Sequence, residues 1–127
     1  MMRFLRTENV IIFHQKIMKK TGGSAGIRDR GLIESALNRV FMTYDGKDLY
    51  PSIIEKVSVT AHSLISNHGF VDGNKRIGVA VLLIMLKMNN IEVCYNQNEL
   101  IDLGLRIAEG FMKEKDILNW IKEHIKD

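Results

Sequence analysis

Residues 67–76 read NHGFVDGNKR and bring a histidine, an aspartate and two cations together within one short stretch. The imidazole of His68 could accept the proton of an incoming hydroxyl group. Asp72 could hold Mg²⁺, which prefers carboxylate oxygens together with phosphate oxygens and water. Lys75 and Arg76 could neutralise phosphate charge that shifts in a transition state. These are the components of a site for phosphoryl or nucleotidyl transfer.

The second half of this stretch, residues 72–76, leads directly into a predicted helix. The first amides of a helix have no partner within it, and the helix dipole is positive at that end. Gly73 lets the backbone approach a ligand closely. We therefore expect the segment to bind phosphate or another anion. A simpler alternative is that Asp72 or Asn74 only caps the helix and that the glycines only form a turn.

Two other interpretations of the stretch fail. A Walker A loop needs G-x-x-x-x-G-K-[ST] after a strand, but Gly69 and Gly73 are separated by only three residues and no strand is predicted before them. A metal pair of His68 and Asp72 would need a helix that continues through both glycines, and no third strong ligand is nearby. Phe70 is expected to anchor the loop in the core.

Apolar residues recur at spacings near 3.6 along most of the chain, which predicts helices nearly throughout. The expected helices cover approximately residues 7–21, 29–41, 52–67, 75–88, 96–109 and 113–126. Thr7 and Asp29 are expected to cap the first two. Ser52 and Glu55 form an S-x-x-E capping box. Asn96 and Glu99 have the same spacing and resemble a second capping box. A glycine pair ends the first helix.

The segment Ile77–Leu86 is apolar on every side, so its helix should be surrounded by others. Met42–Tyr50 is polar and contains a glycine, which predicts a loop, and Ile91–Tyr95 alternates as a short extended piece would. We expect an all-α fold, a compact bundle of about six helices around a buried central helix. Residues 1–127 are expected to form a single domain.

The bulk composition, 46% hydrophobic and 26% charged over 127 residues, is typical of a globular protein. The longest apolar run is too short to span a bilayer, and the start shows no signal-peptide pattern, so we expect a cytoplasmic protein without a membrane partner. The lone Cys94 cannot form an intramolecular disulfide. A net charge of +3 indicates either a solvated basic surface or an anionic partner. Lysines are scattered without an aromatic stripe, so direct nucleic-acid binding is not expected.

Several polar residues outside the stretch are expected to have no catalytic role. His14, His62 and His124 fall within predicted helices and should be polar or half-buried. The Arg28–Arg30 segment is expected to supply a helix cap and ion pairs.

The nine residues HGFVDGNKR at 68–76 resemble the signature of the Fic/Doc superfamily, H-x-F-x-[DE]-G-N-[GK]-R. More narrowly, the chain resembles the Doc (death-on-curing) toxins of bacterial toxin–antitoxin modules. TGGSAGIRDRGLIESAL at 21–37 is similar to the Doc N-terminal segment, and residues 107–110 with Trp120 are similar to its C-terminal end. The resemblance therefore covers almost the whole chain.

The resemblance implies an all-α fold and Mg²⁺-dependent transfer from ATP or another nucleoside triphosphate to a protein hydroxyl. It implies that His68 is the general base and that Asp72 holds the metal. It further implies that Gly73, Asn74 and Lys75 form an anion cradle and that Arg76 contacts phosphates. Phe70 would anchor the loop in the core.

Departures from the broader Fic pattern favour the Doc type. Nucleotidyl-transferring members read G-N-G-R-x-x-R, whereas here Lys75 replaces the middle glycine and Val79 stands in place of the second arginine, which removes a phosphate clamp. Both changes match Doc, which implies a serine/threonine protein kinase acting on a threonine of elongation factor Tu and arresting translation. The alternatives are an AMP or other nucleotidyl transferase and a catalytically weak scaffold.

Two further departures concern the loop and its regulation. Many Fic members have proline after the motif histidine, and Gly69 in its place is expected to loosen the loop. Leu105 stands at the Ser/Thr position of the inhibitory motif [ST]-x-x-x-E-[GN], so no internal inhibitor is expected. The resemblance instead implies inhibition by a separate Phd-like antitoxin chain that folds on binding.

Overall fold

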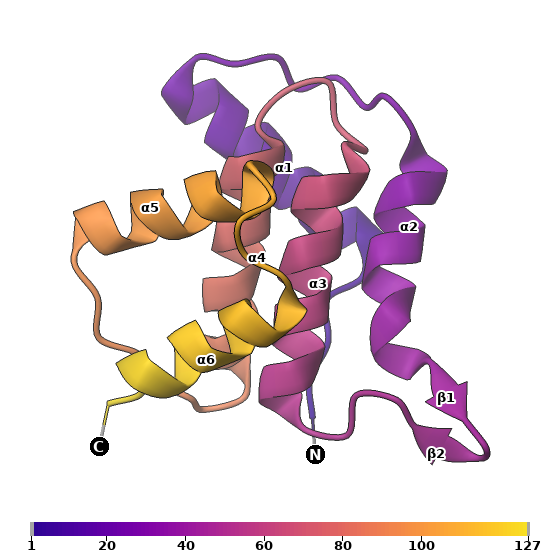
Figure 1. Cartoon of the computed structure of the whole chain (residues 1–127). Helices are drawn as coiled ribbons and strands as arrows, with labels where there is room; N and C mark the ends of the chain where they lie inside the picture. Colours follow the sequence, from indigo (N-terminus) through magenta and orange to yellow (C-terminus); the bar gives the residue numbers. More distant parts are fainter. Residues whose placement is uncertain (1, 127) are drawn as a thin grey trace.

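A computed structural model describes residues 2–126, and Figure 1 shows them as a bundle of helices with one small hairpin. The elements, in chain order, are α1 (Thr7–Thr21), α2 (Arg30–Asn38), the 3₁₀ turn η1 (Arg39–Phe41), β1 (Thr43–Tyr44), β2 (Lys47–Asp48), α3 (Ile53–Asn67), α4 (Asn74–Met88), α5 (Gln97–Ala108) and α6 (Glu114–His124). The predicted all-α fold of about six helices is confirmed for this part of the chain. The antiparallel pair β1–β2 lies in the segment predicted as a loop.

Side-chain caps fix the start of several helices. The carboxylate of Asp29 accepts a hydrogen bond from the third amide of its helix, as predicted. Asn96 and Glu99 form the expected reciprocal capping box. The Ser52 hydroxyl accepts a hydrogen bond from the backbone amide of Glu55 and donates one to the Glu55 carboxylate. The second half of the predicted box, a bond from the Ser52 backbone amide to that carboxylate, is missing. These local bonds explain why α2, α3 and α5 begin close to where the sequence predicts.

Two predictions near the helix ends are wrong. Thr7 is the first residue of α1 rather than its cap, which is Arg6. The second helix was expected to continue to Phe41, but this residue ends the 3₁₀ turn η1, is 60% exposed and packs edge-on against Phe4. The chain tightens into η1 after Asn38, so the 3.6-residue periodicity does not continue to this position.

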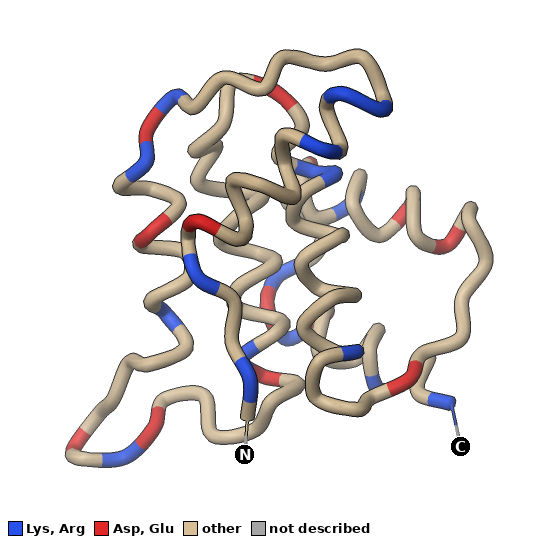
Figure 2. Tube along the Cα trace, turned by 180° about the vertical axis from the view of Figure 1, so that it is seen from behind, with Lys and Arg blue, Asp and Glu red and all other residues tan. Residues whose placement is uncertain are grey.

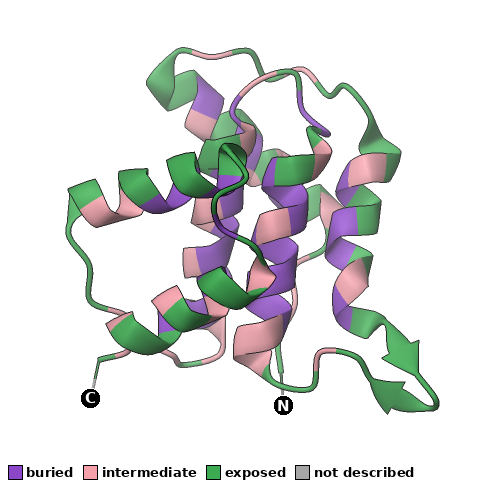
Figure 3. Ribbon diagram, in the orientation of Figure 1, coloured by how far each residue is buried: buried purple, intermediate pink, exposed green. Residues whose placement is uncertain are grey.

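The central helix is α3 rather than α4. It packs against α2, α4, α5 and α6, and it is buried from Lys56 to Ile65 except at His62 (Figure 3). The prediction that Ile77–Leu86 is almost fully buried is wrong in part, because one side of α4 is only half-buried. The half-buried residues are Val79, Ala80, Leu83 and Ile84.

The C-terminal part closes the bundle. Val93, in the segment predicted to be extended, forms an isolated bridge with Ile125. Across residues 2–126, no helix combines the length and the apolar character that crossing a bilayer requires.

Candidate active site

The loop between α3 and α4, residues 68–73, lies at one end of the bundle beside the connector between α1 and α2 (Figure 1). The backbone carbonyl of Gly69 accepts hydrogen bonds from the amides of Arg28 and Asp29, at 2.8 and 2.9 Å. The amide of Val71 donates to the carbonyl of Gly26 at 3.0 Å. The connector therefore holds the loop as a short antiparallel bridge, although the two segments lie far apart in the sequence.

Gly69 is buried and permits this close packing. A Cβ atom at this position would lie 2.5 Å from Cγ1 of Ile33, a fully buried residue of α2. The prediction that Gly69 loosens the loop therefore does not fit the structure, because the glycine lies against α2 and its carbonyl is bonded twice.

His68 ends α3 in the left-handed conformation, with φ = 52°. Such a conformation costs a non-glycine residue roughly 1–2 kcal/mol. The guanidinium of Arg28 offsets part of this cost, because it donates to the carbonyl oxygens of His68 and Asn67 at 2.6 and 3.1 Å. The His68 side chain is exposed and makes no hydrogen bond within residues 2–126. Its imidazole is therefore accessible to a substrate.

The carboxylate of Asp72 is half-exposed. Oδ1 accepts a hydrogen bond from the amide of Gly73 at 2.8 Å and lies 3.4 Å from Nη2 of Arg76. Within the described chain, no group of three or more histidine, cysteine, aspartate or glutamate residues could hold a metal ion. A single carboxylate fits Mg²⁺ of the kind that shares its coordination sphere with substrate phosphates and water. The residues present therefore fit such an ion only together with a bound triphosphate.

The first turn of α4 starts immediately after Gly73, which has φ = 77°. The backbone amides of Asn74, Lys75 and Arg76 have no acceptor among residues 2–126. Together with the helix dipole, these free amides are available to an anion, as the sequence predicts.

The side chain of Asn74 closes the loop instead of facing a ligand. Its amide nitrogen donates to the carbonyl of Phe70 at 3.0 Å, and its oxygen accepts from the amide of Phe70 at 3.1 Å. Phe70 itself, predicted to anchor the loop, is 2% exposed. Asn74 can therefore contribute only its backbone amide to the predicted cradle.

The cations differ in their surroundings. Lys75 is exposed and forms no ion pair within the described residues, whereas Arg76 donates to the hydroxyl of Thr21 at the end of α1. The last turn of α1 adds Lys19 and Lys20. Elsewhere, basic and acidic residues are interspersed over the helices (Figure 2). Positive charge therefore gathers where α1 ends near the start of α4.

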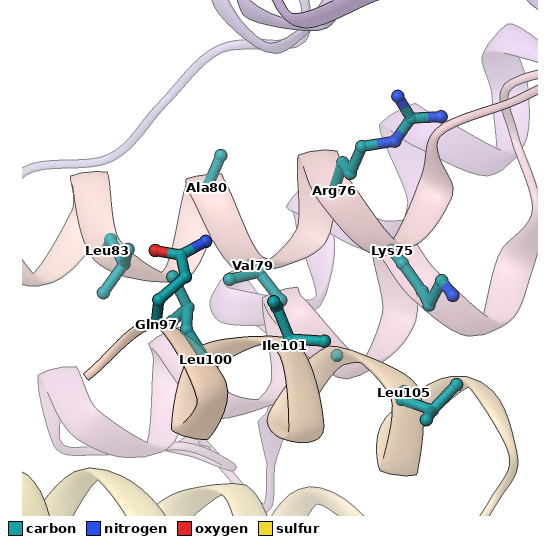
Figure 4. A pocket seen from close by; sticks show the side chains of 10 residues that line it. Lys75, Arg76, Val79, Ala80, Leu83, Gln97, Leu100, Ile101 and Leu105 are labelled. Atoms are coloured by element: carbon teal, nitrogen blue, oxygen red, sulfur yellow. The ribbon is translucent and has the colours of Figure 1, made fainter. Parts of the chain in front are cut away.

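An apolar groove of about 450 Å³ lies between α4 and α5 and starts at these cations (Figure 4). We call it the α4–α5 groove. Its lining is Lys75, Arg76, Val79, Ala80 and Leu83 from α4, with Gln97, Leu100, Ile101, Gly104 and Leu105 from α5. The groove explains why Val79, Ala80 and Leu83 on this side of α4 are only half-buried.

Comparison with known proteins assigns the family. A model of the Fic/DOC family matches residues 4–86, which include the complete loop and most of α4. The chain belongs to the Fic/Doc family.

Two characterised Fic/Doc relatives match over most of the chain. The toxin Doc of Mycolicibacterium smegmatis is 34% identical over 93 residues, which are 73% of this chain and 67% of that protein. The protein kinase doc of Escherichia phage P1 is 27% identical over 124 residues, which are 95% of this chain and 94% of that protein. The second similarity extends to α5 and α6, beyond the part that the family model covers.

Two residues of this Fic/Doc protein contact the loop although the sequence predicted no such role. Arg28 was expected to form ion pairs, but it binds the carbonyls at the end of α3. His14 was expected to be a polar helix residue, but it is fully buried and contacts Phe70 and Asp72. The only signal in the sequence for the contacts of His14 was its position on the apolar face of a predicted helix.

Proposed function

We propose that this Fic/Doc protein is a Doc-type toxin that transfers the γ-phosphoryl group of ATP, or of another nucleoside triphosphate, to a protein hydroxyl. The observation that carries the proposal is the arrangement of one short loop. It combines the accessible imidazole of His68, the half-exposed carboxylate of Asp72 and the free amides at the start of α4. A base, a metal-binding oxygen and an anion site are what this reaction needs.

Each part has a distinct role in the proposed reaction. His68 accepts the proton of the attacking hydroxyl as the new oxygen–phosphorus bond forms and the bond to the departing nucleoside diphosphate breaks. The amides of the first turn of α4, Lys75 and Arg76 bind phosphate oxygens and neutralise their charge. Asp72 would hold Mg²⁺ together with the triphosphate, and the ion would supply Lewis-acid polarisation of the phosphate oxygens.

Two positions on α4 favour phosphoryl over nucleotidyl transfer. Lys75, exposed at the groove entrance, adds bulk and charge where nucleotidyl-transferring members have glycine. Val79 lies in the apolar groove, and a Cβ added to Gly104 would approach its methyl group to 3.1 Å. The Val79 side chain has no donor that could bind a phosphate oxygen, so the second clamp of the nucleotidyl-transferring members is missing from this groove. The name of the phage P1 relative, protein kinase doc, agrees with this choice.

The proposed target is a threonine of elongation factor Tu, so that modification arrests translation in the cytoplasm. This part rests on the resemblance to Doc toxins. The nucleotidyl transferase and the inactive scaffold are the alternatives that experiment must separate.

The proposed regulator is a Phd-like antitoxin that covers the α4–α5 groove and the loop beside it. The groove is apolar along its length and cationic at one end, which suits an amphipathic segment carrying an acidic residue. Ile101 is 59% exposed in the groove, so Ile101→Glu should abolish protection by the antitoxin while leaving the toxin active. Ile12, 46% exposed on α1 and outside the groove lining, gives a matched control in Ile12→Glu.

The activity is tested by incubating the purified protein with a bacterial lysate, Mg²⁺ and γ-labelled ATP. The proposal predicts a labelled band of the size of elongation factor Tu. His68→Ala should lower the rate by about 10²–10⁴, the range for loss of a general base. Asp72→Asn should abolish labelling at ordinary Mg²⁺ concentrations. Absence of any His68-dependent label, with α- as well as γ-labelled forms of all four nucleotides, would favour the scaffold.

A further inference from the structure

His14 lies on α1, outside the signature motif, and none of its side chain is exposed. Nε2 lies 2.7 Å from the backbone carbonyl oxygen of Asp72, 58 residues away in the sequence. Its ring also stacks on Phe70, with ring centroids 3.7 Å apart and planes inclined by 15°. One buried side chain therefore contacts the loop at two points.

The hydrogen bond with Asp72 fixes the orientation of one particular peptide group. A carbonyl oxygen only accepts hydrogen bonds, so Nε2 of His14 carries the proton and donates it. The other end of the same peptide group is the amide of Gly73, which donates to Oδ1 of Asp72 at 2.8 Å. Because a peptide group is planar, a bond that fixes its carbonyl also fixes the direction of its amide. His14 thus determines where the hydrogen bond to the carboxylate points.

This peptide group needs such a restraint. It precedes Gly73, and a glycine accepts both orientations of the preceding peptide at little cost, as the exchange between turn types shows. A flipped peptide would point a carbonyl oxygen at Oδ1 of Asp72 and remove the Gly73 donor. This would leave the carboxylate two longer contacts of 3.4 Å, from the Ser24 amide and from Nη2 of Arg76. The neighbouring residues do not hold this carbonyl, since His14 provides its only side-chain donor among residues 2–126.

We propose that His14 is a positioning residue that holds the Asp72 carboxylate in its metal-binding orientation through the peptide group between Asp72 and Gly73. The inference rests on the proposed function, in which Asp72 holds the divalent cation. His14 does not reach the reacting atoms and does not contact His68. Nδ1 is buried without a partner in the described chain, so the Nε2 proton is the ring's only hydrogen-bond contribution. Loss of His14 should therefore weaken the binding of the divalent cation and leave the general base, His68, unchanged.

Two substitutions separate the hydrogen bond from the packing of the ring. His14→Phe keeps an aromatic ring to stack on Phe70 but removes the donor. His14→Gln removes the ring but places an amide donor near the position of Nε2. Binding of Mn²⁺ in the presence of a non-hydrolysable ATP analogue is measured by electron paramagnetic resonance, with Asp72→Asn as the reference for a lost ligand. We expect Kd for Mn²⁺ to rise about 10–100-fold in His14→Phe, as for other residues that orient a metal ligand, and to stay near wild type in His14→Gln.

The chemical shifts of the His68 imidazole, recorded by NMR in the same variants, distinguish positioning from general damage. They should be the same in wild type and His14→Phe, whereas a collapsed loop would change them. Unchanged Mn²⁺ binding in His14→Phe, with weakened binding in Asp72→Asn, would overturn the inference and leave the proposed function intact. Unchanged binding in Asp72→Asn would instead overturn the metal assignment within the proposed function.

A measurement on the wild-type protein covers the case in which the variants do not fold. Long-range ¹H–¹⁵N spectra report which imidazole nitrogen carries the proton. The inference predicts that Nε2 of His14 carries a proton and that the Gly73 amide is protected from hydrogen exchange. A ring protonated at Nδ1 alone would overturn it, because such a ring cannot donate to Asp72.

Discussion

Gly73→Ala should destabilise the protein far more than the same substitution at Gly22. Both glycines have left-handed φ values, 77° and 85°. At Gly22 an added Cβ meets no atom within 4 Å, whereas at Gly73 it would lie 2.3 Å from Cε and 2.8 Å from Sδ of Met18. Both substitutions therefore carry the cost of the left-handed backbone, and only Gly73→Ala adds a steric clash with Met18.

The magnitudes follow from these two terms. The left-handed conformation costs alanine roughly 1–2 kcal/mol, and a less flexible unfolded chain returns about 0.4–1 kcal/mol. Gly22→Ala should therefore lose about 1 kcal/mol. Met18 is 1% exposed, and its Sδ also lies 2.6 Å from the Cβ position of Gly23, so the thioether has little room to move. Overpacking of this kind adds about 1–3 kcal/mol, which gives about 2–4 kcal/mol for Gly73→Ala.

Urea denaturation followed by circular dichroism measures both free energies of unfolding. Gly73→Ala should also slow phosphoryl transfer, because it would displace the turn in which the Gly73 amide donates to the Asp72 carboxylate. The contact is tested further by repeating Gly73→Ala in a Met18→Ala background, where its additional cost should largely disappear. Equal destabilisation by Gly73→Ala and Gly22→Ala would refute the argument that the loop lies directly on α1.

Three further substitutions test other contacts. Asn74→Ala leaves the amide and carbonyl of Phe70 without partners and should cost about 1–3 kcal/mol in a urea titration. Lys56 is only 4% exposed, and its ammonium donates to the Val40 carbonyl of η1 at 2.9 Å, so Lys56→Met should cost about 1–2 kcal/mol by the same assay. Glu99→Gln should flatten the pH dependence of the melting temperature by removing the charged partner of His124, whose Nε2 lies 2.6 Å away.

The sign of the last effect follows from two opposite shifts. Burial alone would lower the pKa of His124, but the hydrogen bonds with Glu99 and the Trp120 carbonyl outweigh it and raise that pKa. The hydrogen bond with His124, then that with the Asn96 amide, lowers the pKa of Glu99. The contribution of His124 is lost as pH rises through its raised pKa, and that of Glu99 is lost as pH falls through its lowered pKa. The pair therefore stabilises most between the ordinary values, about pH 4.5 to 6.5.

Each of these three predictions has a contrary outcome. A neutral Asn74→Ala would mean that the loop is held mainly by the connector. A neutral Lys56→Met would mean that water replaces the ammonium at η1. A Glu99→Gln variant whose melting temperature falls above pH 6.5 as steeply as that of the wild type would show that the pair contributes no pH dependence.

Local signals in the sequence predicted the helices well. The bounds of α3 follow from the Ser52 cap and from the turn at residues 68–73, both of which act over a few residues. The hairpin was missed although its signal was present: Asp45 and Gly46 both have positive φ, as expected for Asp-Gly in a two-residue turn.

The arrangement of the helices around the site could not be predicted in the same way. An apolar run does not reveal whether a neighbouring helix covers all of it, so the open side of α4 was missed. The bonds from Arg28 to residues 67–68 and from His14 to Asp72 join segments 39–58 residues apart. Such contacts depend on how the helices pack. The motif itself identified the loop because its chemistry is concentrated in nine consecutive residues.

The central claim, transfer of the γ-phosphoryl group, is tested most directly by one reaction with doubly labelled ATP. The purified protein is incubated with Mg²⁺, elongation factor Tu and ATP that carries ³³P at the α position and ³²P at the γ position. His68→Ala serves as the control for enzyme-dependent label. The proposed function predicts ³²P alone in the target band, and only with the wild-type protein. His68-dependent ³³P in that band would contradict it and identify a nucleotidyl transferase.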